Sequence, residues 1–149
     1  MTDIREHALD NGLRIALQPD PSIPVVGIAV YYDVGSRNEE RGRSGFAHLF
    51  EHMMFEGSAN VKKTEHFRHI SSWGGSLNGT TSQDRTNYYE SLPSHQLRLG
   101  LWLEADRMRS LAVTDENFEN QRQTVMEERR QRIDNSPYGN AFIRIGEIS

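Results

Sequence analysis

Two histidines and a glutamate stand close together in the sequence, at His48, Glu51 and His52. In a helix, His48 and His52 are one turn apart, so both imidazoles leave the same face. Glu51 lies three residues after His48, and its carboxylate emerges between them. Two imidazoles can bind a zinc ion, and a carboxylate beside them can act as general base for a zinc-bound water. The spacing therefore indicates zinc-dependent hydrolysis.

The same spacing can also arise without a metal, as a hydrogen-bonded pair of histidines in a core. The flanking residues favour the metal, because apolar side chains cover one side of the same stretch at Phe46, Leu49, Phe50, Met53 and Met54. Such a helix should be largely buried, and three buried ionisable groups need partners. The order His-x-x-Glu-His is the reverse of the commoner zinc peptidase motif, and peptidases with the inverted order are known.

A catalytic zinc site usually has three protein ligands and an open position, so a third ligand must come from elsewhere. The chain has no cysteine, which leaves His, Asp and Glu as ligands. His66 and His69 are three residues apart, but no carboxylate is in register with them, and we expect both at the surface. The strongest remaining candidates are Glu127 and Glu128.

Helical phase separates these two glutamates. At about 100° per residue, Phe118, Gln121, Val125 and Glu128 fall within a sector of roughly 80°, whereas Glu127 lies on the opposite face. If Phe118 and Val125 face the core, Glu128 does as well. We therefore predict that Glu128 is the inward carboxylate and that Glu127 is a solvated acid.

Length and composition bound the possible functions. At 149 residues and 36% hydrophobic content, the chain can bury one core and amounts to one domain at most. A net charge of −4 gives no electrostatic reason to expect nucleic acid or an anionic membrane as a partner. No apolar run has the length of a membrane span, and the polar first residues do not form a signal peptide. We expect a soluble chain without membrane insertion, and the compartment stays open.

The β-strands are predicted from turn signals and from apolar runs. Asp10-Asn11-Gly12 predicts a hairpin over residues 6–18. The apolar run from Val25 to Val34 predicts a central strand buried on both faces. Residues 35–43 should form an exposed, charged loop. Residues 76–92 have strand character on both sides of a polar turn and predict a second hairpin.

The helices are predicted from caps and from apolar spacing. Ser44 is a plausible N-cap of the motif helix, Thr64 of a helix ending near Trp73, and Thr114 of a helix ending near Ile133. Phe67, Ile70 and Trp73 should lie on one side of the second of these helices. A further helix from Pro93-Ser94 has core spacing at Leu97, Leu101, Trp102, Ala105 and Met108. Together, these elements predict an α+β fold with helices packed on one face of a mostly antiparallel sheet.

The motif and the glutamate that lies 76 positions beyond His52 resemble the pitrilysin family. That family includes insulin-degrading enzyme and the mitochondrial processing peptidase. The resemblance extends over nearly the whole chain, through Asp10-Asn11-Gly12-Leu13, Gly45 to Gly57, Gly74-Gly75-Ser76-Leu77-Asn78 and Thr86-Asn87-Tyr88-Tyr89. It implies that the chain is the first part of a two-layer sandwich module of that family.

The resemblance also implies roles for single residues. His48, His52 and Glu128 would bind one Zn²⁺ per module, and Glu51 would activate the water. The strand around Leu77, Asn78 and Gly79 would pair with an extended peptide substrate by strand addition. Without the resemblance, Asn-Gly in a strand is often only a bulge or a turn.

Two positions depart from the family pattern. The family often carries a glutamate seven residues before the third ligand, which supports that ligand from outside the metal. Here this position is Gln121, which can form hydrogen bonds but adds no charge. Gly79 stands where an alanine is usual, which is a mild change.

The length is the larger departure. Family members consist of paired modules that close around the substrate, with an Arg and a Tyr from the second module touching the peptide. This chain ends at Ser149, inside what would be the first module. We therefore expect residues 1–149 to form a single partial metallopeptidase module, with its partner module on the same or another chain.

The expected function is a zinc-dependent endopeptidase that hydrolyses peptides or small unfolded polypeptides, although the isolated chain need not be active. One alternative is a non-catalytic subunit that shapes a chamber or binds peptides. Another is zinc as a purely structural clamp, which would require a fourth protein ligand, and no fourth His or acid suggests itself by spacing.

Overall fold

The computed structural model of the chain describes residues 3–40, 42–139 and 141. Its main sheet has three antiparallel strands in the order β3-β5-β4. These strands are β3 (Val25–Tyr32), β4 (Ser76–Thr81) and β5 (Thr86–Pro93). A separate two-stranded sheet pairs β1 (Arg5–Ala8) with β2 (Arg14–Leu17).

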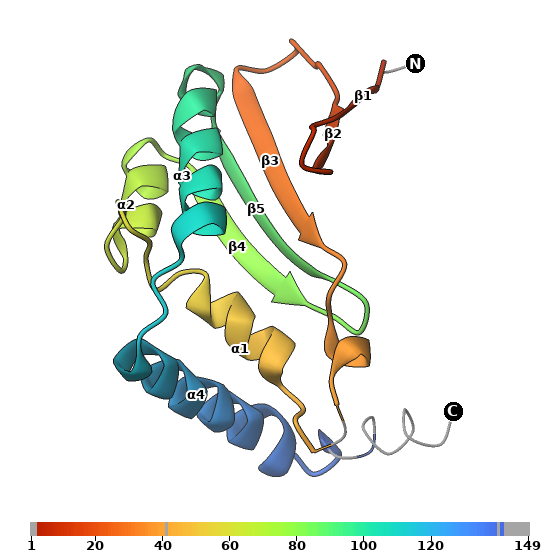
Figure 1. Ribbon diagram of the computed structural model, residues 1–149, viewed down its shortest axis with the longest axis vertical. Helices are drawn as coiled ribbons and strands as arrows, with labels where there is room; N and C mark the ends of the chain where they lie inside the picture. Colours follow the sequence, from red (N-terminus) through yellow and green to blue (C-terminus); the bar gives the residue numbers. More distant parts are fainter. Residues whose placement is uncertain (1–2, 41, 140, 142–149) are drawn as a thin grey trace.

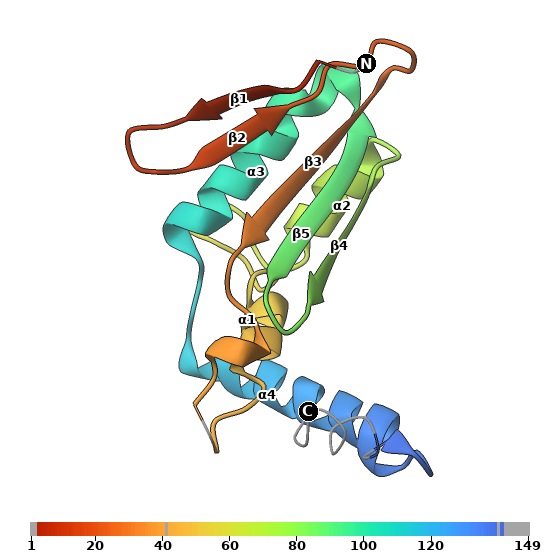
Figure 2. The same ribbon diagram turned by 90° about the vertical axis from the view of Figure 1, so that its right-hand side faces the viewer.

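Four α-helices accompany the sheets in the described part of the chain: α1 (Phe46–Met53), α2 (Glu65–Ser72), α3 (Leu97–Ser110) and α4 (Asp115–Arg129). Short turns of helix occur at η1 (Ser36–Asn38) and η2 (Ser94–Gln96), and η3 (Arg130–Asp134) continues α4. Helices α2 and α3 cover one face of the main sheet, whereas α1 and α4 lie at one of its ends (Figures 1 and 2). The fold is therefore α+β, as the sequence predicts.

Both predicted hairpins are confirmed. In the β1–β2 turn, Gly12 has a φ of +89°, and the Asn11 side chain accepts a hydrogen bond from the backbone N–H of Leu13 at 3.1 Å. A positive φ costs glycine little, which explains the Asn-Gly pair at this turn. In the β4–β5 turn, the N–H of Ser82 donates to the carbonyl of Arg85 at 2.8 Å.

The prediction that residues 25–34 form a central strand is wrong for the described residues. β3 pairs with β5 alone and lies at the edge of the three-stranded sheet. Its burial alternates, with Val25 48% and Tyr31 66% exposed. An apolar run indicates β structure but does not count the neighbours of a strand. The loop that follows is also less exposed than expected, because Gly35 is buried and the N–H of Ser36 donates to the carbonyl of Ser82 at 3.1 Å.

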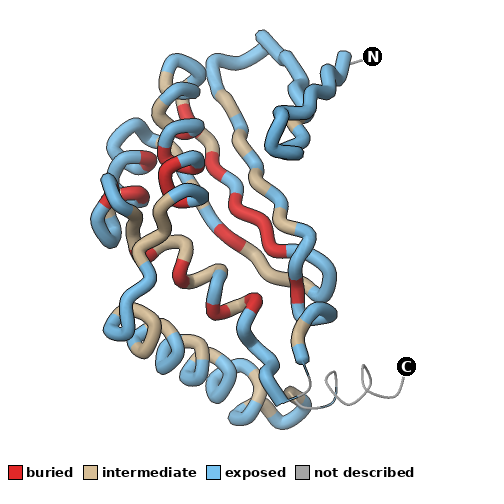
Figure 3. Tube along the Cα trace, in the orientation of Figure 1, coloured by how far each residue is buried: buried red, intermediate tan, exposed pale blue. Residues whose placement is uncertain are grey.

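The core lies between the main sheet and the helices α2 and α3. Figure 3 shows buried positions along the inner side of these elements. The buried residues of this core are Val61, Ile70, Leu92 and Leu103. Burial of such apolar side chains is the main favourable term that fixes the helices on the sheet. No helix in the described part of the chain combines the length and the apolar character that a membrane span needs.

Two helices are turned differently from the prediction. On α2, Ile70 is buried as expected, but Phe67 and Trp73 are 42% and 48% exposed. On α3, the predicted core residues are exposed, among them Leu97, Leu101, Trp102 and Met108. The buried side of α3 instead carries Gly100, Leu103, Glu104, Asp106 and Arg107. Polar side chains can take this side because Glu104 and Arg107 pair with each other.

Candidate metal centre

Side chains from α1 and α4 meet where these two helices pack together. His48 Nε2 and His52 Nε2 are 3.2 Å apart. Glu128 approaches from α4, with carboxylate oxygens 3.8 Å from His48 Nε2 and 3.6 Å from His52 Nε2. We call His48, His52 and Glu128 the metal cluster. No fourth His, Cys, Asp or Glu of the described residues joins it.

The dimensions of the metal cluster suit a small divalent cation. In a tetrahedral site with bonds of 2.0–2.1 Å, as zinc forms with nitrogen and oxygen, neighbouring donor atoms are about 3.3 Å apart. The two Nε2 atoms are 3.2 Å apart, close to that value, and the Glu128 oxygens lie 3.6 Å (Oε1) from His52 Nε2 and 3.8 Å (Oε2) from His48 Nε2. Three donors also leave a tetrahedral ion with one open position, as in catalytic zinc sites.

The protonation pattern of His52 favours a cation as well. His52 Nδ1 lies 3.2 Å from the Gln121 carbonyl oxygen, an acceptor, so Nδ1 carries the proton of the neutral ring. The lone pair of Nε2 is then free and faces His48 Nε2. That lone pair can accept a hydrogen bond from an Nε2–H of His48, and a bound cation between the two atoms would replace this hydrogen bond by ligation. Gln121, predicted to support the site, thus contacts His52 rather than Glu128.

The start of α1 is held by a residue that the sequence did not reveal. The helix begins after Gly45, which has a φ of +97°, and no side chain at the cap position forms a cap hydrogen bond. Instead, the two oxygens of the Glu39 carboxylate accept hydrogen bonds at 2.8 Å from the N–H groups of Gly45 and Ala47. The prediction of Ser44 as N-cap is wrong, because a carboxylate satisfies two free N–H groups and suits the positive helix end.

Glu51 lies beside the metal cluster and faces β4. Its Oε2 accepts a hydrogen bond of 2.5 Å from the Thr81 hydroxyl. Its side chain also passes close to Gly79, where an added Cβ would come within 3.1 Å of Glu51 Cγ. Glu51 is thus held between the two histidines of its own helix and the edge strand. Thr81 had not been singled out in the sequence, where nothing marks a threonine in a strand as a partner of a helix 30 residues away.

The predicted substrate strand forms one wall of the same cavity. The cavity has a volume of about 560 Å³, and its lining includes the metal cluster, Glu51, Asn78 and Gly79. Among the described residues, β4 pairs with β5 alone, so one of its edges has no strand partner. Leu77 packs against the hydrophobic core, which leaves its backbone as the part that can face a ligand. Asn78 Oδ1 accepts a hydrogen bond of 2.9 Å from the Gly79 N–H.

His66 departs from the prediction of a surface position, whereas His69 is exposed as expected. His66 is 6% exposed and points inward from α2, where its Nε2 lies 3.2 Å from Glu90 Oε2. Glu104 completes a second group of potential ligands with them. Arg107 donates to both oxygens of Glu104 in this group. We call His66, Glu90, Glu104 and Arg107 the buried cluster. The carboxylate partner that helical register did not supply comes from β5.

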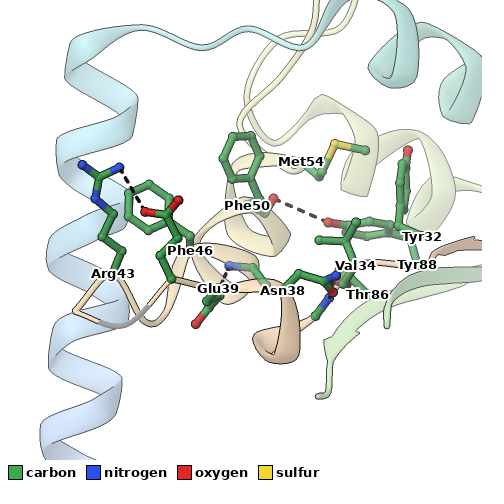
Figure 4. A pocket seen from close by; sticks show the side chains of 13 residues that line it. Tyr32, Val34, Asn38, Glu39, Arg43, Phe46, Phe50, Met54, Thr86 and Tyr88 are labelled. Carbon is green, nitrogen blue, oxygen red and sulfur yellow. Dashed lines mark hydrogen bonds and ion pairs between the residues drawn. The ribbon is translucent and has the colours of Figure 1, made fainter. Parts of the chain in front are cut away.

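A second cavity, of about 410 Å³, borders the other face of α1. Figure 4 shows it from close by, with Phe46 and Phe50 of α1 and the adjoining Met54 opposite Tyr32 and Tyr88. The Tyr88 hydroxyl donates to the Phe50 carbonyl at 3.5 Å, and burial raises the pKa of that hydroxyl. The histidines lie on the opposite face of the helix, so this largely apolar cavity has no part in the metal cluster.

The chain is similar in sequence to known peptidases. The sequence model described as Insulinase (Peptidase family M16) matches residues 14–143. The zinc protease PqqE of Helicobacter pylori is 40% identical over 137 residues, which cover 91% of this chain and 31% of that protein. The mitochondrial-processing peptidase subunit beta of Blastocladiella emersonii is 29% identical over 120 residues, or 80% of this chain and 26% of the relative. Subunit 1 of the bovine cytochrome b-c1 complex is 31% identical over 80% of this chain and 25% of its own length.

A solved structure is also similar. The crystal structure of a protease from Helicobacter pylori superposes with a TM-score of 0.89 at 39% identity, over 93% of this chain and 33% of that one. The chain thus spans about a third or less of the length of these relatives.

Proposed function

The chain belongs to the insulinase family of zinc proteases, peptidase family M16, and we propose that it supplies the catalytic centre of a zinc-dependent endopeptidase. The observation that carries the proposal is the meeting of His48, His52 and Glu128 beside Glu51 on the wall of one cavity. Residues 1–149 would form one partial module of this enzyme, and a second module on the same or another chain would close the chamber around the peptide.

The metal cluster would hold one zinc ion through the two Nε2 atoms and the Glu128 carboxylate. When bound, zinc lowers the pKa of a coordinated water and polarises a substrate carbonyl. Glu51 would accept a proton at Oε1, since its Oε2 is engaged by Thr81, and would later deliver that proton to the leaving amine. Thr81 keeps the carboxylate aimed into the cavity.

The proposed substrate is an extended stretch of peptide. β4 offers a strand edge that lies on the same cavity wall as Glu51. A peptide added to this edge would be held by backbone hydrogen bonds, which do not depend on its sequence. The backbone around Leu77, Asn78 and Gly79 would thus position the scissile bond, and small unfolded polypeptides or peptides would be accepted.

Glu51→Gln in the full-length protein tests the proposed role of the base. Cleavage of an unstructured fluorogenic peptide should fall by about 10²–10⁴-fold, because the amide cannot accept the proton. Zinc content should stay unchanged, since Glu51 is not a ligand. Glu127→Gln, an exposed glutamate on α4, serves as the control and should cleave like the wild type. Turnover of Glu51→Gln within a few-fold of the wild type would exclude Glu51 as the base.

One observation supports a second candidate, a non-catalytic subunit that shapes a chamber or binds peptides. One of the relatives is a subunit of the cytochrome b-c1 complex. The same assay separates the two candidates. A non-catalytic subunit would bind the peptide without cleaving it, whereas the endopeptidase should lose cleavage when a chelator removes the zinc and regain it when zinc is restored.

A further inference from the structure

A series of polar contacts leads away from His52 to a carboxylate just beyond the end of α1. His52 Nδ1 lies 3.2 Å from Gln121 Oε1, and Gln121 Nε2 donates to Glu56 Oε1 at 2.8 Å. Lys63 Nζ lies 2.7 Å from the other oxygen, Glu56 Oε2. That last contact is an ion pair rather than an aligned hydrogen bond, since Oε2 forms none. The links come from the end of α1, from α4 and from the loop before α2.

Glu56 is buried, and this determines which group donates and which accepts in each of these hydrogen bonds. The Glu56 side chain is 5% exposed, so its carboxylate needs partners inside the protein. A carboxylate can only accept hydrogen bonds, so the Gln121 amide must turn its nitrogen towards Glu56. The carbonyl oxygen of Gln121 is then left for His52, and it can only accept. His52 Nδ1 must therefore be the protonated nitrogen.

The orientation of the Gln121 amide matters at the His52 end of this series of contacts. With the proton on Nδ1, the Nε2 lone pair of His52 faces His48 and Glu128, where a metal would be bound. Gln121 alone could not enforce this, because an amide can present either its oxygen or its nitrogen to the ring. Gln121 presents its oxygen to His52 only because Glu56 binds its nitrogen.

We propose that Glu56 is a positioning residue of the metal centre, which fixes the tautomer of His52 through the Gln121 amide. Partners of this kind beyond the ligands orient metal-binding histidines and make them more basic. Glu56 thus supplies, through one neutral link, the negative charge that Gln121 lacks. The proposal rests on the proposed metal centre but does not require that the protein cleave peptides.

Exchanging the side chains of Glu56 and Gln121 gives the sharpest test. Glu56→Gln removes the obligate acceptor, so the Gln121 amide can turn and both tautomers of His52 become available. Gln121→Glu places two carboxylates at the 2.8 Å contact, where like charges repel. The double variant Glu56→Gln/Gln121→Glu restores an acceptor for His52 and a donor for that acceptor. Glu127→Gln is the control, because Glu127 is exposed on the same helix as Gln121.

Two measurements on the full-length protein decide the matter. The first is the ¹⁵N shifts of His52 in zinc-free, ¹⁵N-histidine-labelled protein, at a pH well above the usual histidine range. The second is zinc affinity by competition with a chelator. We expect a single Nδ1–H tautomer in the wild type and in the double variant, and a mixture in Glu56→Gln. Zinc affinity should fall about 10–100-fold in each single variant and return to within a few-fold in the double variant.

An unchanged tautomer in Glu56→Gln would overturn the proposal. So would losses of affinity that simply add in the double variant, because independent structural damage at two sites is additive whereas a shared contact is not. A wild type that binds no zinc would instead remove the proposed function, and the tautomer measured without metal would still decide the role of Glu56.

Discussion

The described residues hold two clusters that each bring together three potential metal ligands, and the clusters differ in exposure. In the metal cluster, the side chains of His48, His52 and Glu128 are 32%, 19% and 29% exposed and line an open cavity. In the buried cluster, the side chains of His66 and Glu90 are 7% and 1% exposed. Both groups place potential ligand atoms within 4.8 Å of one another.

The larger difference between the two clusters is whether they contain a cationic side chain. The buried cluster contains its own, because Arg107 donates to both oxygens of Glu104 and stacks 4.3 Å above the Tyr88 ring. In the metal cluster, the nearest arginine is Arg132, whose side chain is 74% exposed and lies 3.6 Å from Glu128 Oε2, the oxygen that also faces His48. The two Nε2 atoms face each other with no cation of the described residues between them.

This comparison shows that residue types and spacing alone do not define a metal site. The buried cluster is closed to solvent and contains its own arginine, which pairs with Glu104, so its charged side chains serve the fold. A cluster with converging lone pairs, no internal cation and a path to solvent can take a metal from outside. Three changes would break or sharpen this contrast.

The largest expected effect is on the buried cluster. Arg107→Met should lower the free energy of unfolding by about 3–5 kcal/mol, because Glu104 would be left buried without its counter-charge. Arg122→Met is the matched control, since Arg122 pairs with Glu119 at the same i,i+3 spacing but at the surface. The loss of stability in Arg122→Met should be far smaller, because exposed ion pairs contribute little. Urea unfolding of the full-length variants measures both values.

A second variant separates lost charge pairing from lost packing. Glu104→Leu/Arg107→Met removes both charges and should recover most of the stability. Zinc content should be unaffected in every one of these variants. If Arg107→Met instead lost zinc and kept its stability, the assignment of the two clusters would be reversed.

The next effect is on the metal cluster. Glu128→Gln should weaken zinc binding by more than about 100-fold, beyond what loss of an outer partner produces. The stability of the zinc-free protein should change by no more than about 0.5 kcal/mol, because Glu128 is not part of the core. Glu127→Gln, one residue away on the exposed side of α4, should change neither quantity. Equal losses of affinity in both variants would remove Glu128 from the site.

Local geometry is what the sequence predicted well. Turn residues gave both hairpins, and 100° steps along a helix were enough to turn Glu128 rather than Glu127 towards α1. The α+β class follows from the same local patterns. The roles of Glu128 as a ligand and of Glu51 as a base stay predictions, because they depend on what binds.

Partners across the fold are what the sequence could not predict. Trp102 and Met108 have core spacing on α3, yet Glu104 and Arg107 are buried because each neutralises the other. His66 finds its partner on β5, and α1 is capped by Glu39 from the preceding loop. Glu56 lies three residues beyond the end of α1, so helical spacing does not predict its contact with Gln121.

The smallest expected effect is on pH dependence, where two glutamates of like pairing should behave oppositely. Burial raises the pKa of Glu104 above its ordinary 4.5, although Arg107 opposes this. The Arg122 hydrogen bond lowers the pKa of the exposed Glu119 to about 2. In the folded protein, Glu104 therefore keeps its proton to a higher pH than in the unfolded chain, and Glu119 releases its proton at a lower pH.

The signs follow from linkage. The contribution of Glu104 to the free energy of unfolding is greatest below pH 4.5 and declines as the pH rises through the raised pKa of the folded state. The contribution of Glu119 is present above pH 4.5 and is lost as the pH falls towards about 2. Glu104→Gln should remove the first slope and Glu119→Gln the second, as urea unfolding over a pH series can measure. Slopes of the same sign would mean that the Arg107 charge outweighs burial at Glu104. The Arg107–Glu104 ion pair would then stabilise the fold more as the pH rises, and the internal cation would remain the feature that separates the buried cluster from the metal cluster.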